Sequence, residues 1–202
     1  MLSVIESRVK RLRRIIRRKS IDALLITNIR NIRYLTGFTG SSAFALITGT
    51  RSLFFTDFRY TEQAEHEVLC FERLVEKGKR IQLLQAQAKK MGISSLGFEA
   101  SASYEFYDQL CRTGISLLPQ NGIVEKMRMV KDESEIAKIR EAIRRAEEAF
   151  LAIKPKIRPG VTERKVALML EDELKKRGCL KVPFDIIIAS GRHSSMPHAG
   201  QT

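Results

Sequence analysis

The chain has 202 residues, of which 44% are hydrophobic and 29% are charged, so it can bury a core and disorder is not expected. Its 36 Lys and Arg residues outnumber its 23 Asp and Glu residues, and the net charge of +13 raises nucleic acid and acidic membranes as candidate partners. No apolar run approaches the roughly 20 residues of a membrane helix, which excludes a membrane-spanning protein. The three cysteines form no CxxC pair, which argues against a disulfide framework or a cysteine-based zinc site and favours a reducing, cytoplasmic location.

The first element is predicted to be an amphipathic helix. Apolar residues recur at helical spacing, at Ile5, Val9, Leu12 and Ile16. Eight basic residues lie between positions 8 and 19, and no aromatic residue interleaves with them. We expect the apolar side to dock on the domain and the basic side to be a solvated surface. Nucleic-acid or membrane-surface binding through residues 8–19 is the alternative.

A solvated basic surface has a consequence for stability. Exposed charges contribute little to the free energy of unfolding. Only a slight change in stability is therefore expected when Gln replaces Arg13, Arg14, Arg17 and Arg18.

Short strands and helices alternate over the next hundred residues. Strands are predicted at 22–27, 43–48, 52–56, 68–74, 95–98 and 115–118. Helices are predicted at 29–35, 60–67, 79–91 and 103–111. Strands that alternate with helices indicate an α/β layer domain, which we assign to residues 1–124.

The pattern changes in residues 125–202, which we assign to a second domain. A long helix is predicted over 131–153, with Asp132 as its N-cap and Glu135 completing a capping box. Its expected apolar stripe consists of Ile136, Ile139, Ile143, Ala146, Phe150 and Ile153. A second helix is predicted between Thr162 and Gly178. Residues 184–189 are predicted to be a buried strand.

Two polar segments of the first domain are better explained by structural roles than by ligand binding. The loop Gly37–Ser42 could cradle an anion with its amides, but it lacks the long helix and lysine of a phosphate loop, so a structural turn is the preferred interpretation. Asp57 follows a strand and precedes a helix, which favours an N-cap with an ion pair to Arg59.

The segment 189–200 is the most informative part of the chain. A predicted strand opens there into a polar loop that holds two of the three histidines, His193 and His198. Loops that follow rigid strands commonly carry functional residues.

Six ordered sequence blocks resemble one family. They are residues 21–28 (IDALLITN), 31–42 (NIRYLTGFTGSS), 55–60 (FTDFRY), 129–136 (MVKDESEI), 158–163 (RPGVTE), and 189–191 (ASG) with 197–199 (PHA). Together they resemble the pita-bread metallopeptidases, in the branch of Xaa-Pro aminopeptidase, prolidase and creatinase. The resemblance implies a creatinase-like N-terminal domain, with a mixed sheet flanked by helices, followed by an incomplete pita-bread (α+β) catalytic domain.

The resemblance also implies a chemistry. Family members hydrolyse the peptide bond before proline with two divalent metal ions (manganese, cobalt or zinc), which activate a water and polarise the carbonyl. Their ligands are two Asp, one His and two Glu, all downstream of the position that matches Pro197–Ala199. This chain is therefore expected to bind no metal by itself and to be inactive alone.

One site residue is transferred by position. The resemblance assigns His198 to substrate binding or carbonyl stabilisation in the complete site, whereas His193 matches no family site. The partners it implies are proline-containing peptides and a second copy of the chain in a homodimer. The sequence leaves open the choice between a dipeptidase and an aminopeptidase, and also the alternative of a non-catalytic oligomerisation or protein-binding module.

Overall fold

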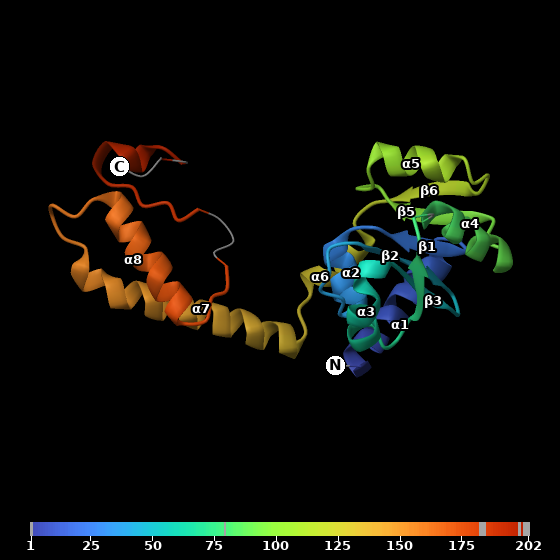
Figure 1. Cartoon of the computed structure of the whole chain (residues 1–202), viewed down its shortest axis with the longest axis horizontal. Helices are drawn as coiled ribbons and strands as arrows, with labels where there is room; N and C mark the ends of the chain where they lie inside the picture. Colours follow the sequence, from blue (N-terminus) through green and yellow to red (C-terminus); the bar gives the residue numbers. More distant parts are fainter. Residues whose placement is uncertain (1, 79, 182–184, 198, 200–202) are drawn as a thin grey trace. The chain divides into compact units, whose positions relative to one another are not determined.

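The computed structural model describes residues 2–78, 80–181, 185–197 and 199, which form two compact units, residues 1–130 and 131–202 (Figure 1). The boundary lies after Val130, whereas the sequence placed it after Val124. The difference is helix α6 (Ile123–Met129), which the sequence did not predict. Ile123, Val124 and Met127 are buried in the core of the first unit, so α6 belongs to that unit.

The first unit alternates strands and helices as predicted. Its strands are β1 (Ala23–Ile26), β2 (Ala43–Thr48), β3 (Ser52–Asp57), β4 (Glu72–Glu76), β5 (Ser95–Glu99) and β6 (Ser116–Gln120). Its helices besides α6 are α1 (Leu2–Arg18), α2 (Ile29–Thr36), α3 (Thr61–Glu67), α4 (Arg80–Lys90) and α5 (Tyr104–Cys111). Apart from β4, and from α1, whose ends were not predicted, these elements match the predicted ones to within about two residues at each end, the usual uncertainty of boundaries. Lys79, the predicted start of α4, lies outside the described residues.

The six strands form one mixed sheet in the order β4-β3-β2-β1-β5-β6. The strands β1, β2 and β3 are antiparallel neighbours, and β4, β5 and β6 pair in parallel with β3, β1 and β5 respectively. The predicted mixed sheet flanked by helices is therefore confirmed.

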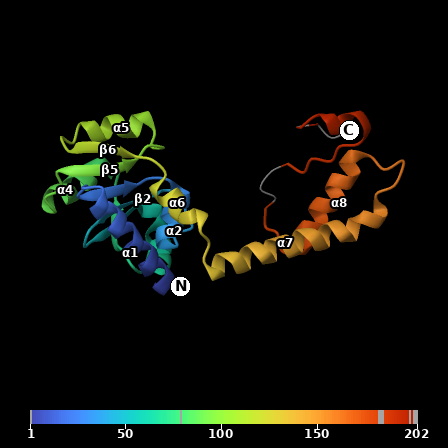
Figure 2. The same cartoon turned by 180° about the vertical axis from the view of Figure 1, so that it is seen from behind.

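Helices cover both faces of this sheet (Figures 1 and 2). On β1, Leu24 and Ile26 pack with α1, α2, α3 and α6, whereas Ala23 and Leu25 pack with α4 and α5. Side chains of a strand alternate between the two faces, so a run in which every residue is apolar is expected for a strand that is covered on both sides.

Strand β4 begins four residues later in the chain than the predicted extended segment 68–74. Val68 and Phe71 are buried as core side chains in the loop that precedes it. The position of β4 is fixed by its ladder to β3, in which Leu53 pairs with Glu72 and Asp57 with Glu76. That pairing is a tertiary property that apolar spacing does not encode.

The apolar side of α1 is buried as predicted. Ile5, Val9, Leu12 and Ile16 all belong to the core. Arg8 contributes to the docking, because its guanidinium donates to the carbonyl oxygen of Tyr34 at 2.8 Å and lies 4.0 Å from the centre of that ring.

The basic side of α1 is not uniformly solvated. The guanidinium of Arg13 donates to the carbonyl oxygens of Thr48 at 3.2 Å and Thr50 at 2.9 Å, and to the hydroxyl of Ser52 at 3.0 Å. These bonds tie α1 to the turn between β2 and β3. For Arg13 the expectation of a solvated charge is wrong, because helical spacing places it beside that turn rather than toward water.

The second unit contains the two predicted helices. They are α7 (Glu133–Ile153) and α8 (Glu163–Lys176), which lie against each other, and short 3₁₀ turns follow at Lys154–Lys156 and Gly191–Ser195. The predicted capping box of α7 is confirmed: the Asp132 carboxylate accepts from the Glu135 amide at 3.0 Å, and the Glu135 carboxylate accepts from the Asp132 amide at 3.0 Å.

Two predictions for the second unit differ from the structure. Of the expected apolar stripe on α7, Ile153 is buried, but Ile139, Ile143 and Phe150 are about half exposed (45%, 52% and 48%). Residues 185–189 of the predicted strand form no strand, and Phe184 lies outside the described residues. A strand needs a partner for its backbone groups, and the described residues of this unit offer none.

Candidate functional site

The loop singled out by the sequence is anchored to the first turn of α8. This helix begins after a turn at Gly160, whose φ of 89° lies in the left-handed region that glycine tolerates best. Thr162 is its N-cap, with a side chain that accepts from the Lys165 amide at 3.3 Å. Glu163 is the first residue of the helix and is only 7% exposed.

The Glu163 carboxylate contacts the loop at three atoms. Its Oε1 accepts from the backbone amide of Ser190 at 2.7 Å and from the Ser190 hydroxyl at 3.0 Å. Its Oε2 lies 3.2 Å from Nδ1 of His193. A buried carboxylate is costly without such partners, so these contacts stabilise both the charge and the loop.

The loop folds into a tight turn around these contacts. The His193 amide donates to the Ser190 carbonyl at 3.1 Å, and the Met196 amide donates to the His193 carbonyl at 3.0 Å. After the turn, the Ala199 amide donates to the Met196 carbonyl at 3.3 Å, and Ala199 is buried.

Of the two histidines of the loop, the structure describes His193 but not His198. His198, the predicted site residue, lies outside the described residues, so its role stays a prediction. His193, which matches no family site, contacts the Glu163 carboxylate through Nδ1.

Sequence reasoning did not assign a role to Glu163. It stood inside the RPGVTE block, where a Thr N-cap and an acid in the first turn are ordinary helix-start features. Its loop partners are 27 and 30 positions away in the chain, a separation that no local pattern reveals.

The two polar segments of the first unit have structural roles. Asp57 caps the following turn by accepting from the Arg59 amide at 3.2 Å, and Arg59 also donates to it through Nε at 2.8 Å. The hydrogen bond from the Arg59 side chain lowers the pKa of Asp57 to about 2. In the loop Gly37–Ser42, the Thr39 amide donates to the Glu67 carboxylate at 2.6 Å, so an acid of the same chain occupies this amide.

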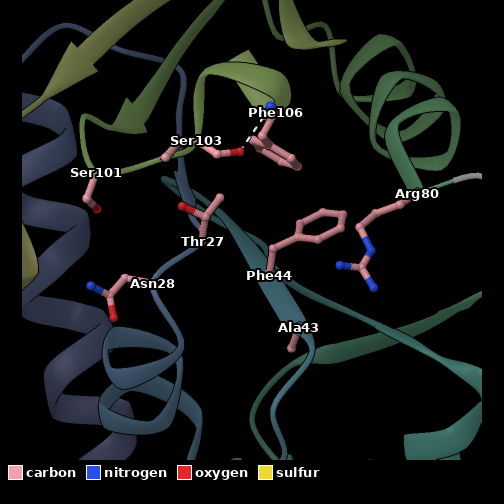
Figure 3. Close-up of a pocket in the computed structure, with 9 residues that line it drawn as sticks. Thr27, Asn28, Ala43, Phe44, Arg80, Ser101, Ser103 and Phe106 are labelled. Atoms are coloured by element: carbon pink, nitrogen blue, oxygen red, sulfur yellow. Dashed lines mark hydrogen bonds between the residues drawn. The ribbon is translucent and has the colours of Figure 1, made fainter. Parts of the chain in front are cut away.

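A pocket of about 300 Å³ opens at the carboxyl ends of β1 and β5 (Figure 3). Thr27, Asn28 and Ser101 lie on one side of it, with Phe44 and Arg80 on the other. Its described lining contains no Asp, Glu, His or Cys that could act as an acid, base or nucleophile.

Arg80, the one charged residue in the described lining of this pocket, is already paired. The Arg80 guanidinium lies 3.1 Å from the Glu76 carboxylate and 3.7 Å from that of Asp57. Its positive charge is thus balanced within the chain, and the pocket has weak electrostatic attraction for an anionic ligand.

Within the described part of the chain, no three His, Cys, Asp or Glu side chains come together as a potential metal site. The described residues therefore contain no cluster that could hold the dinuclear centre implied by the family resemblance. No described helix is long and apolar enough to cross a membrane.

Comparisons with known proteins place these units in a family. The Creatinase/Prolidase N-terminal domain matches residues 8–130, and Metallopeptidase family M24 matches residues 137–202. An uncharacterized peptidase of Bacillus subtilis, YqhT, is 39% identical over 95% of this chain and 55% of its own length.

Solved structures agree with these matches. The Xaa-Pro dipeptidase from Bacillus anthracis is 38% identical with a TM-score of 0.92, over 98% of this chain and 56% of that one. The prolidase from Pyrococcus horikoshii is 32% identical with a TM-score of 0.83, over 97% and 56% respectively. This chain thus spans about half the length of the relatives it matches. Through residues 8–130 it belongs to the creatinase/prolidase family, and residues 137–202 match Metallopeptidase family M24, so the chain matches the N-terminal portion of these relatives.

Proposed function

We propose that this chain is the N-terminal part of a dinuclear-metal peptidase that hydrolyses the peptide bond before proline. The observation that carries the proposal is the similarity to the Bacillus anthracis Xaa-Pro dipeptidase, which extends through both units at a TM-score of 0.92. A match confined to the first unit would support only a shared N-terminal domain. Here the second unit, with its anchored loop, is included.

The proposal divides the work between this chain and a region beyond residue 202. That region supplies two Asp, one His and two Glu that hold the metals, which activate water and polarise the carbonyl when bound. This chain supplies His198, which hydrogen-bonds the substrate or the reacting carbonyl. Such a contact contributes roughly 10²- to 10⁴-fold to the rate and does not replace the nucleophile.

Proline-containing peptides are the proposed substrates. The Xaa-Pro bond is a tertiary amide, so the substrate has no N–H at the scissile position to donate to the enzyme. Relatives of this chain are named both Xaa-Pro dipeptidase and Xaa-Pro aminopeptidase, and both activities fit the proposal. A homodimer and a cytoplasmic location are further parts of it, and the free thiols of Cys70, Cys111 and Cys179 suit a reducing compartment.

The coding sequence beyond codon 202 gives the first test. The proposal expects an open frame of roughly the same length again, containing the two Asp, the His and the two Glu in that order. A stop codon directly after Thr202, or a continuing frame without those ligands, would contradict it and favour a non-catalytic module.

A further inference from the structure

The contact between Glu163 and the loop is unusual for a residue at the start of a helix. An acid in the first helical turn commonly interacts with the free amides of its own helix. In α8, Thr162 already caps the Lys165 amide, and the Glu163 carboxylate turns to residues 27 and 30 positions downstream. Both of its oxygens are engaged with the loop, so the contact constrains the direction of the loop as well as its distance from α8.

The two oxygens of Glu163 perform separate tasks. Oε1 accepts both bonds from Ser190, which directly precedes the 3₁₀ turn Gly191–Ser195. Oε2 faces Nδ1 of His193, in the middle of that turn. The carboxylate therefore fixes the turn at its entry and at its centre.

We propose that Glu163 is a positioning residue: it holds the turn 190–195 against α8 and so sets the direction in which the chain leaves this turn. This role rests on the proposed function, because it matters for catalysis only if the segment that follows the turn reaches the substrate. The anchoring itself is a property of the 202-residue chain.

Amide hydrogen exchange of the 202-residue chain tests the anchor directly. The Ser190 amide is expected to be protected, and Glu163→Ala is expected to raise its exchange rate about 10- to 100-fold, the range for a lost hydrogen bond to a charged group. Glu171→Ala is the matched control on the same helix, since it removes only an exposed pair with Lys175. It should leave the Ser190 rate unchanged.

Glu163→Gln keeps the test decisive if Glu163→Ala unfolds the second unit. The side-chain amide oxygen of Gln can accept both hydrogen bonds from Ser190. Its NH₂ group can donate to Nδ1 of His193 when the neutral imidazole carries its proton on Nε2. Protection of Ser190 should then stay within about threefold of the unchanged chain. An unprotected Ser190 amide in the unchanged chain, or equal rates in the Glu163→Ala and unchanged chains, would overturn the proposal.

Kinetics of the full-length product of the coding sequence test the catalytic consequence. At a temperature where all variants are folded, Glu163→Ala should lower kcat on an Xaa-Pro dipeptide about 10- to 100-fold, whereas Glu171→Ala should leave kcat unchanged and Glu163→Gln should restore it. Unchanged kcat in Glu163→Ala would overturn the positioning role. If the unchanged full-length protein does not cleave Xaa-Pro peptides, the proposed function fails, and the exchange result still decides whether Glu163 is the anchor.

Discussion

Arg13 differs from the other basic residues of α1 in what its guanidinium contacts. It makes three hydrogen bonds to the β2–β3 turn, whereas Arg14, Arg17 and Arg18 are exposed and have no ion-pair partner among the described residues. Arg13→Gln should therefore lower the free energy of unfolding by about 1–2 kcal/mol. Arg14→Gln should change it by less than about 0.5 kcal/mol. Urea unfolding of the two variants measures the difference, and equal losses would show that the Arg13 contacts do not stabilise the domain.

Asp57 gives a residue-scale prediction for pH. Its folded pKa of about 2 is below the ordinary value of 3.8, because the Arg59 side chain donates to the ionised form. The stabilisation is therefore fully present above about pH 4 and is lost as the pH falls through about 2. The gap in unfolding free energy between the unchanged chain and Asp57→Asn should shrink between pH 5 and pH 2. A gap that stays constant over that range would contradict the assignment.

The packing around Gly40 leaves no room for a side chain. A Cβ at this position would lie 2.3 Å from Cζ of Phe38 and 2.9 Å from Cδ1 of Tyr60. Phe38 is buried against β3, so its ring has little room to move. Gly40→Ala should destabilise the first unit by about 1–3 kcal/mol.

Gly49→Ala is the control for Gly40. A Cβ there meets no atom within 4 Å, and alanine restricts the unfolded chain, so the change should be neutral or slightly stabilising. Thermal unfolding of both variants checks the pair. Equal midpoints would show that the loop accommodates a side chain at Gly40.

At the scale of elements, the sequence predicts the helices and strands whose signals come from residues close together in the chain. The all-apolar strand β1, the amphipathic α1 and the capping box of α7 each follow from residues near one another in the chain. The start of β4 and the existence of α6 do not, because β4 is fixed by its ladder to β3 and α6 by burial of Ile123 and Met127 in a distant core.

In the second unit too, local spacing does not predict which apolar surfaces are buried. The spacing of Ile139, Ile143 and Phe150 gives the face of α7 on which they lie, but it does not tell whether this chain covers that face. The candidate site was predictable as a loop from its histidines. Its anchor at Glu163 was not, because the contact joins segments 27 residues apart.

At the scale of the molecule, the question is whether the chain contains a complete active site. The chain spans about half of the relatives it matches, and its described residues bring no potential metal-ligand cluster together. The proposed function makes these 202 residues one part of an Xaa-Pro peptidase, which needs the other part for turnover.

Hydrolysis of an Xaa-Pro dipeptide and tripeptide, beside a matched Xaa-Ala peptide, tests this claim most directly. The 202-residue chain, the full-length product and its His198→Ala variant are assayed with and without manganese or cobalt. We predict turnover only by the full-length product, only with metal and only before proline, and a loss of roughly 10²- to 10⁴-fold in the variant. Metal-dependent turnover by the 202-residue chain, or a full-length product that does not cleave Xaa-Pro peptides, would contradict the account.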